Sequence, residues 1–255
     1  MALLEVKNLC KDFGGLVAVN NVNFNLQEGQ IFTLIGPNGA GKTTTFNMIA
    51  GSFPATSGSV RYNGEELLGK AAYQIAQKGV TRTFQITAVF HGISVFNNIL
   101  AAMHINQKAT FVDALFCTKL IREEEIQIRE KAVEILKFVG LYEDRNEEAA
   151  SLPYGKQRLL EIAIALASGP KLVLLDEPAA GLNPEETRSL MELIRRIRVS
   201  GVSVLLIEHN MNLVMDISDY IVVLDHGVVI AEGLPEEISH NPRVIEAYLG
   251  KGGVE

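Results

Sequence analysis

The sequence predicts an α/β protein with a mainly parallel sheet, a β-rich N-terminal part and an inserted helical segment. Several apolar runs are typical of buried strands, and most of them are followed by a helical pattern, as in a parallel sheet covered by helices. Between about residues 88 and 151 there is little strand pattern, and apolar residues recur at helical spacing instead. The strand-like runs are Ile31–Ile35, Leu172–Leu175, Val202–Ile207 and Tyr220–Leu224, the first three of which precede a helical pattern.

The N-terminal part and the middle of the chain differ in their periodicity. Before the first buried run, Val22, Phe24 and Leu26 alternate with polar residues, which predicts a half-exposed antiparallel strand. In the middle, the apolar face of a solvated amphipathic helix is expected from Ile128, Ala132, Ile135 and Val139. We therefore expect one domain, with an α/β core at 1–87 and 152–255 and a helical subdomain at 88–151.

Composition excludes several classes of protein. The 255 residues are 47% hydrophobic and 21% charged, as in globular proteins, and a net charge of −7 argues against nucleic acid as a partner bound by bulk charge. Cys10 and Cys117 are far apart and lack neighbouring ligands, so a reducing compartment is favoured over a disulfide framework or a zinc site. No secretory signal and no apolar stretch of the roughly 20 residues that span a bilayer are visible, so a membrane role would require a partner.

A phosphate-binding loop follows the first buried strand. Its glycines allow successive backbone N–H groups to face phosphate oxygens, and the following helix, Thr43–Ala50, adds the partial positive charge of its N-terminus. Lys42 would reach the β- and γ-phosphates of ATP, and the Thr43 hydroxyl would face Mg²⁺. The loop residues are Gly36, Pro37, Asn38, Gly39, Ala40, Gly41, Lys42 and Thr43, and Thr44 is assigned to the same nucleotide site.

Two carboxylates end the second buried strand. A parallel strand delivers its last side chains to the carboxyl edge of the sheet, where the phosphate loop also opens. Asp176 would hold Mg²⁺ there, and Glu177 would polarise the attacking water as general base. The alternative is a strand that ends in a solvated acidic turn.

With these motifs, nearly the whole chain resembles the ATP-binding cassette family. The resemblance implies that Gln85 links Mg²⁺ to a membrane partner, that His209 contacts the γ-phosphate, and that Phe13 stacks on adenine. Segment Leu152–Gln157 resembles the family signature, and Gly181–Pro184 resembles the loop facing the opposite subunit. Taken singly, Gln85 and His209 also fit ordinary surface residues and Phe13 fits a core residue. The common order of all these elements favours the family.

The signature departs from the family pattern. The family usually has serine at Pro153, glycine at Tyr154 and glutamine at Lys156, while Gly155 is kept. Proline offers neither a hydroxyl nor an N–H, so a weaker contact with the nucleotide of the facing subunit and slower turnover are expected, with Lys156 as a partial replacement. Asn183 stands where many members have aspartate, and it is also a good helix cap before a proline and two glutamates.

The resemblance is strongest to ATP-binding subunits of branched-chain amino acid uptake systems, through segments 122–141, 179–184 and 241–250. It implies an ATPase with ATP and Mg²⁺ and a second cassette as partner in a homo- or heterodimer. Transmembrane permease subunits would hold it at the cytoplasmic membrane face, and a periplasmic or extracellular solute-binding protein would act indirectly. Alternatives are a soluble non-transport cassette, import of another small solute, and lipid movement.

Overall fold

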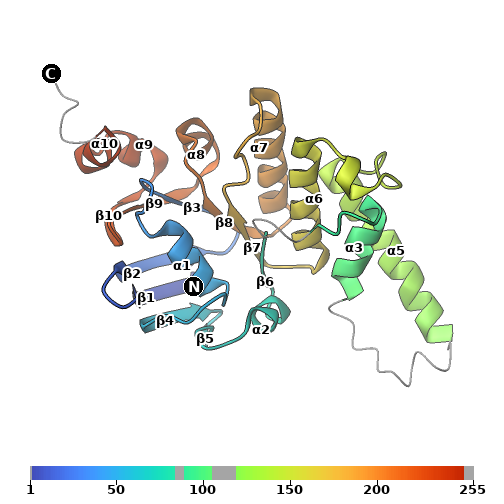
Figure 1. The fold of residues 1–255 in the computed structure, drawn as a ribbon, viewed down its shortest axis with the longest axis horizontal. Helices are drawn as coiled ribbons and strands as arrows, with labels where there is room; N and C mark the ends of the chain where they lie inside the picture. Colours follow the sequence, from blue (N-terminus) through green and yellow to red (C-terminus); the bar gives the residue numbers. More distant parts are fainter. Residues whose placement is uncertain (1, 84–88, 105–118, 250–255) are drawn as a thin grey trace. The chain divides into compact units, whose positions relative to one another are not determined.

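The computed structural model describes residues 2–83, 89–104 and 119–249 (Figure 1). The chain divides into two compact units, of which the first comprises Met1–Arg82 with Lys171–Glu255 and the second comprises Thr83–Pro170. Among the described helices, none combines the length and apolar character that crossing a bilayer requires.

A six-stranded sheet forms the centre of the first unit. The strand order is β10-β9-β3-β8-β7-β6, and every neighbouring pair is parallel except β9 and β10 (Figure 1). The mainly parallel sheet predicted from the sequence is therefore confirmed. Its strands are β3 (Ile31–Ile35), β6 (Val80–Arg82), β7 (Leu172–Asp176), β8 (Ser203–Ile207), β9 (Tyr220–Asp225) and β10 (Val228–Gly233).

The predicted apolar runs match four of these strands to within one residue at each end. β3, β7 and β8 are buried at every position, which explains why they read as continuous apolar runs without alternation. β7 continues one residue beyond its predicted end because Asp176 still pairs with Ile207 of β8.

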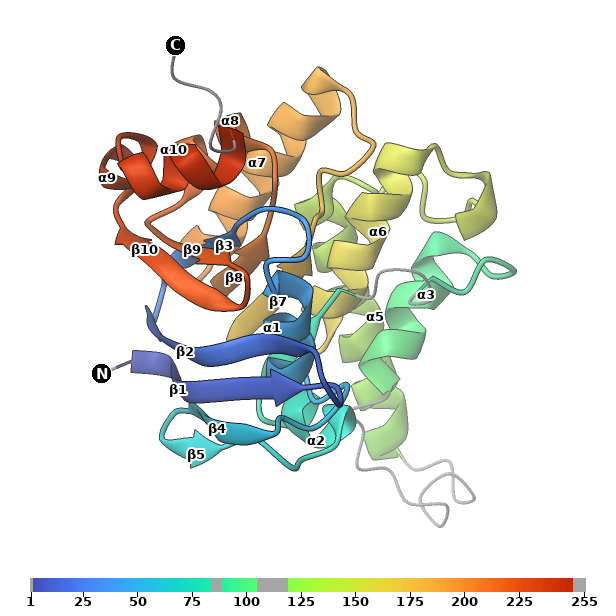
Figure 2. The same ribbon diagram turned by 60° about the vertical axis from the view of Figure 1, so that its left-hand side comes forward.

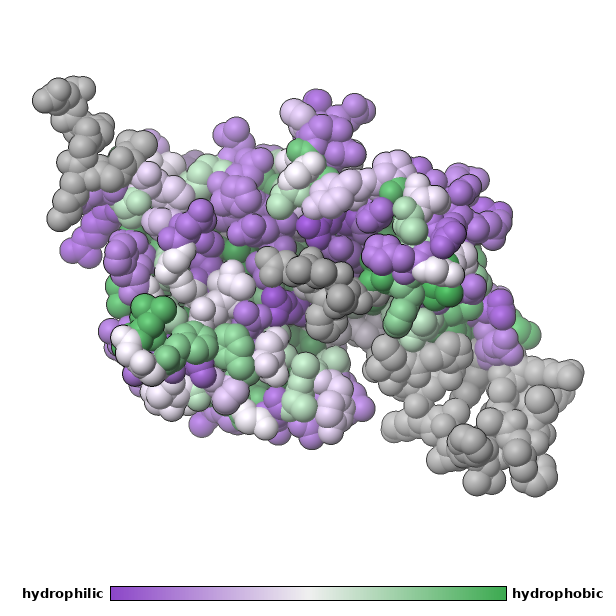
Figure 3. Space-filling view, viewed as in Figure 1, coloured by the Kyte–Doolittle hydropathy of each residue, from purple (hydrophilic) through white to green (hydrophobic). Residues whose placement is uncertain are grey.

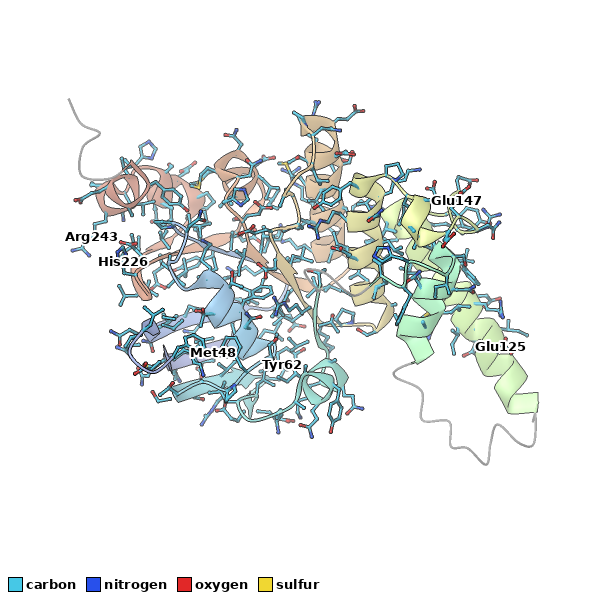
Figure 4. All side chains as sticks on the ribbon, viewed as in Figure 1. Met48, Tyr62, Glu125, Glu147, His226 and Arg243 are labelled. Carbon is cyan, nitrogen blue, oxygen red and sulfur yellow. The ribbon has the colours of Figure 1, made fainter. Side chains whose placement is uncertain are left out.

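An antiparallel sheet of order β2-β1-β4-β5 completes the β structure of the first unit. On β2, Val22, Phe24 and Leu26 are buried while their neighbours are exposed, as the alternation predicts. Met48 of α1 belongs to the same hydrophobic core and lies between α1 and this sheet (Figure 4). The elements are β1 (Ala2–Asp12), β2 (Val17–Gln27), β4 (Ser57–Tyr62), β5 (Glu65–Glu66) and α1 (Lys42–Ile49).

Among the described residues, five further helices belong to the first unit. α9 and α10 pack beside β10, as Figure 2 shows, and Val244 of α10 joins a small core with Ile35 and Val223. The five are α2 (Ala72–Gln77), α7 (Pro184–Val199), α8 (Met211–Ile217), α9 (Pro235–Ser239) and α10 (Pro242–Leu249).

The second unit is helical where the structure describes it, and its described elements are α3 (Val95–His104), α5 (Lys119–Val139), the 3₁₀ helix η1 (Ala149–Ser151) and α6 (Tyr154–Ala167). α3, α5 and α6 pack against one another. Ala132 and Val139 lie on the buried face of α5, whereas Glu125 is exposed and pairs with Arg129 one turn later (Figure 4). The unit includes α6, a helix that the expected boundaries of 88 and 151 assign to the α/β core.

Candidate nucleotide site

The phosphate loop connects β3 to α1 and requires glycine at two positions. Gly36 has φ +148°, and a Cβ atom there would lie 2.0 Å from the Leu224 carbonyl oxygen. Gly41 has φ +96°, and its Cβ would lie 2.5 Å from the Ala18 carbonyl oxygen. The loop is therefore fitted between the end of β9 and the start of β2, with no space for a side chain at either glycine.

Lys42 is the first residue of α1 and is almost fully buried, with 6% of its surface exposed. Its Nζ donates hydrogen bonds to the carbonyl oxygens of Gly36 at 2.7 Å and Pro37 at 3.0 Å. Burial lowers the pKa of Lys42, and the nearby carboxylates of Glu177 and Asp176 oppose that shift. The loop thus holds an ammonium group at the N-terminus of a helix, the arrangement that attracts phosphate.

Asp176 ends β7 and is paired with Arg82 at the end of β6. The Arg82 Nη2 atom lies 3.0 Å from Asp176 Oδ2, and 12% of the arginine side chain and 1% of the aspartate side chain are exposed. Arg82 also donates to Asn47 Oδ1 and lies over the ring of Phe46, 5.1 Å from its centroid. Sequence reasoning missed Arg82, because a single arginine in a strand gives no indication of its partner.

The other oxygen of Asp176 suits a cation. Oδ1 is buried, and no described residue donates a hydrogen bond to it. Burial raises the pKa of Asp176 and Glu177 adds to the increase, while Arg82 and Lys42 oppose it. A buried carboxylate oxygen without a donor is the kind of oxygen ligand that Mg²⁺ takes, directly or through water. The residues present therefore fit the expected metal.

Glu177 follows in an unusual backbone conformation, with φ +47°. Its N–H donates to the Ile207 carbonyl oxygen at 2.9 Å, and its own carbonyl accepts from Ala180 N–H at 3.1 Å. His209 follows β8, the strand beside β7, and its Nδ1 lies 3.8 Å from Glu177 Oε2, too far for a hydrogen bond. The structure brings these two predicted residues together, each partly exposed to solvent.

Glu208, between β8 and His209, is a second residue that the sequence analysis missed. Its side chain is fully buried, and it accepts three backbone hydrogen bonds. One comes from the Ala179 N–H, beyond β7, and the others come from His209 and Asn210. A carboxylate directly after the apolar run that ends β8 was the available signal, as it was for Asp176 after the apolar run of β7.

Phe13 lies in the turn between β1 and β2 and is 53% exposed, so it is no core residue. Its ring meets that of Phe53 edge-on at 5.7 Å, and the Lys11 ammonium lies 4.9 Å from its centroid. Leu16 and Val17 are also exposed, and hydrophobic surface gathers over β1 and β2 in Figure 3. A flat aromatic face at the surface is suited to stacking on a nucleobase.

Asn183 acts as the cap of α7. Its Oδ1 accepts from the N–H groups of Glu185 at 2.9 Å and Glu186 at 3.0 Å, and the Glu186 carboxylate accepts from the Asn183 N–H. Asn183 therefore caps the N-terminus of α7, as its position before a proline and two glutamates leads us to expect.

The signature-like segment opens α6 in the second unit. Pro153 precedes the helix and provides no side-chain cap, and Gly155 is buried. Tyr154 is half exposed, and its hydroxyl accepts from Arg158 Nη2 at 2.6 Å. The Lys156 ammonium lies 2.6 and 2.9 Å from the two carboxylate oxygens of Asp144, so much of its charge is neutralised locally. That pairing weakens Lys156 as a replacement for the missing serine.

Gln85, the expected link to Mg²⁺ and a membrane partner, lies outside the described residues.

Comparison with known proteins identifies the family. A family model described as ABC transporter matches residues 19–180, which include the phosphate loop, the signature-like segment and the acidic end of β7. The chain belongs to the ABC transporter family. It is an ATP-binding, ATP-hydrolysing subunit of that family. A second model, described as branched-chain amino acid ATP-binding cassette transporter, matches residues 228–254 of this ABC cassette.

Named relatives extend over nearly the whole ABC cassette. The high-affinity branched-chain amino acid transport ATP-binding protein BraF of Pseudomonas aeruginosa is 48% identical over 250 residues, covering 98% of both chains. The corresponding protein LivG of Escherichia coli is 46% identical over the same length and coverage.

Solved structures agree with this cassette fold. An ATP-binding cassette in its ADP conformation matches with a TM-score of 0.86 and 31% identity, covering 98% of this chain and 100% of that chain. A nucleotide-free cassette matches with a TM-score of 0.85 and 32% identity at the same coverage.

Proposed function

We propose that this chain hydrolyses ATP to power the import of branched-chain amino acids. Support for the cargo comes from the names of the relatives BraF and LivG and from the family model that matches residues 228–254. Support for the chemistry comes from one observation in particular. Lys42 follows β3 through the phosphate loop, and Asp176 and Glu177 lie at the end of β7, so all three belong to the carboxyl edge of one parallel sheet, where both carboxylates oppose the lowering of the Lys42 pKa.

In this proposal the phosphate loop receives the phosphates of ATP. The N-terminus of α1 and the Lys42 ammonium attract the β- and γ-phosphates, while Thr43 and Thr44 offer hydroxyls from the first turn of α1. Phe13 stacks its exposed face on adenine. The other proposed contacts along the loop are Gly36, Pro37, Asn38, Gly39, Ala40 and Gly41.

Mg²⁺ would be held by Thr43, Asp176 and Gln85. Bound there, it would neutralise charge on the phosphates as the terminal group departs. Asp176 contributes its unpaired Oδ1, and Arg82 fixes the carboxylate through Oδ2.

Glu177 is proposed as the general base. Its side chain is one-third exposed, so a water molecule can reach it, and it lies in the same unit as the phosphate loop. His209 lies on the facing loop and is proposed to contact the γ-phosphate once that phosphate is bound between the two loops.

Two chains are proposed to act together, because the resemblance to the family implies that the signature-like segment of one chain faces the nucleotide held by the phosphate loop of the other. Pro153, Tyr154, Gly155 and Lys156 would then face the ATP held by the partner, with Asn183 near the same interface. Permease subunits would anchor the pair at the cytoplasmic face of the membrane, and Gln85 would transmit nucleotide state to them. A solute-binding protein outside the membrane would deliver the cargo to those permeases.

Uptake of radiolabelled leucine tests the cargo. Cells that lack the gene should lose saturable leucine uptake, and the wild-type gene should restore it while Lys42→Ala should not. Uptake of a labelled sugar in the same cells is the control. Unchanged leucine uptake in the deletion strain would contradict the proposed cargo and favour another small solute or lipid movement. Co-purification with ribosomes or DNA instead of membrane subunits would favour a soluble non-transport cassette.

A further inference from the structure

Glu208 is a buried carboxylate to which the proposed reaction assigns no role. None of its surface is exposed, and both carboxylate oxygens accept backbone hydrogen bonds. Oε1 accepts from Ala179 N–H at 2.9 Å, and Oε2 accepts from His209 N–H at 3.0 Å and Asn210 N–H at 3.2 Å. Burying such a group is costly unless its acceptor oxygens are satisfied, and these three donors satisfy both of them.

The three donors come from two separate loops. Ala179 lies two residues beyond Glu177, in the loop that follows β7, and His209 with Asn210 forms the loop that follows β8. The loop after β7 is also bonded to the end of β8, where the Glu177 N–H donates to the Ile207 carbonyl oxygen. Glu208 therefore spans the segments that carry the proposed general base and the proposed γ-phosphate contact.

We propose that Glu208 is a positioning residue for ATP hydrolysis: its carboxylate joins the loop after β7 to the loop after β8 and so fixes Glu177 relative to His209. This inference rests on the proposed roles of those two residues. Glu208 touches no substrate in this role and acts only through the backbone of its neighbours. Reactivity depends steeply on such placement, because an error of about 1 Å can reduce a rate by about 10²-fold.

Glu208→Gln is the informative change, because both carboxylate oxygens of Glu208 accept backbone hydrogen bonds. An amide keeps the shape of the side chain but has only one acceptor oxygen, and its NH₂ group would meet a backbone N–H on the other side. Glutamine can therefore satisfy the loop after β7 or the loop after β8, but not both. Glu208→Asp keeps both acceptor oxygens on a shorter side chain and should be intermediate.

Steady-state ATPase assays on the purified full chain test this. Glu208→Gln should lower kcat by about 10²-fold and leave KM for ATP within about threefold of wild type, because ground-state binding is preserved. Ser203→Ala is the matched control. Ser203 is equally buried at the other end of β8, where its Oγ accepts from the Gly29 N–H at 2.9 Å, so its loss should affect stability and not kcat. A kcat within twofold of wild type for Glu208→Gln would overturn the proposal.

A double-mutant cycle separates positioning from general stability. In a His209→Ala background, Glu208→Gln should cost much less in kcat than in wild type, because one of the two groups that it aligns is gone. Equal costs in both backgrounds would overturn the proposal. If Glu208→Gln does not fold, Glu208→Asp replaces it in the same cycle. Retained hydrolysis in Glu177→Gln would instead contradict the proposed function itself, so the two failures are distinguishable.

Discussion

At the residue scale, Glu177 combines a proposed catalytic role with a backbone conformation that suits glycine or asparagine. Its φ of +47° lies in the left-handed region, which costs an ordinary L-residue about 1–2 kcal/mol. Hydrogen bonds to Ile207 and from Ala180 hold the backbone in place. Such strain is retained where function requires a particular side chain.

The strain leads to a prediction about stability. Glu177→Asn should raise the free energy of unfolding by about 1 kcal/mol relative to Glu177→Gln, because asparagine tolerates the left-handed region better. Both variants should lose ATP hydrolysis. Urea denaturation of the two nucleotide-free proteins measures the difference, and equal stabilities would show that the conformation carries no strain.

Arg82 supports Asp176 as a buried ion pair, so its removal should be costly. Arg82→Met leaves the aspartate charge buried without its partner, and it should lower the free energy of unfolding by about 3 kcal/mol. The double variant Arg82→Met/Asp176→Asn removes both charges and should recover much of that loss. Chemical denaturation measures all three proteins, and a double variant no more stable than Arg82→Met would contradict the pairing.

The buried Asp176 carboxylate, paired with Arg82, also predicts that the stability of the folded chain depends on pH. Because burial raises the pKa of Asp176, the folded chain keeps this proton to a higher pH than the unfolded chain does. This group therefore favours the folded state below its ordinary pKa of 3.8, and the advantage is lost as pH rises through the raised value.

Binding of Mg²⁺ requires the ionised carboxylate, so Mg²⁺-dependent ATP affinity should fall on acidification through the raised pKa of Asp176. Arg82→Gln removes a positive charge that opposes the increase, and it should move the fall to higher pH. Fluorescent-nucleotide titrations across pH measure this, with Mg²⁺-free samples as control. An unchanged profile in Arg82→Gln would contradict the coupling.

Residue-level prediction from the sequence was possible only where a local pattern existed. The phosphate loop and the Asp176–Glu177 pair were recognisable from spacing beside apolar runs. Arg82 was not recognisable, because its partner Asp176 lies 94 residues away. Glu208 offered only its position after an apolar run, and its role in joining two loops was hidden because its partner Ala179 lies 29 residues away. No local periodicity encodes such contacts.

At the scale of elements, the buried strands were predictable because both faces of β3, β7 and β8 are covered. The signature-like segment that opens α6 was recognisable, but the packing partners of this helix were not. An amphipathic pattern shows that one face is buried without showing what covers it. The assignment of α6 to the second unit therefore required the structure.

The start of α6 offers a prediction at this scale. Pro153→Ser supplies the capping oxygen that the helix lacks, and it should raise the free energy of unfolding by about 1 kcal/mol. The added hydroxyl should also strengthen the proposed contact with the facing nucleotide and raise the ATPase rate. Denaturation and phosphate-release assays measure the two effects.

Asn183→Ala, which removes the existing cap of α7, is the reverse control and should lower stability by a similar amount. An unchanged or lower ATPase rate in Pro153→Ser would contradict the idea that the proline limits turnover.

At the scale of the whole molecule, the phosphate loop and α6, which begins at the signature-like segment, belong to separate compact units. In the proposed cycle, two chains close around ATP and reopen after hydrolysis. ATP should therefore convert the Glu177→Gln variant from monomer to dimer in sedimentation velocity experiments. Lys42→Ala at the same ATP concentration should stay monomeric, and a monomeric Glu177→Gln at saturating ATP would contradict the two-chain arrangement.

We assign ATP hydrolysis by this chain to the site formed by Lys42, Asp176 and Glu177. Phosphate release by purified wild-type protein, with ATP and Mg²⁺, tests it most directly beside Glu177→Gln. The wild type should release phosphate steadily, and Glu177→Gln should lose nearly all release while it still binds ATP. Equal release by both proteins would contradict it, because the general base would then lie elsewhere.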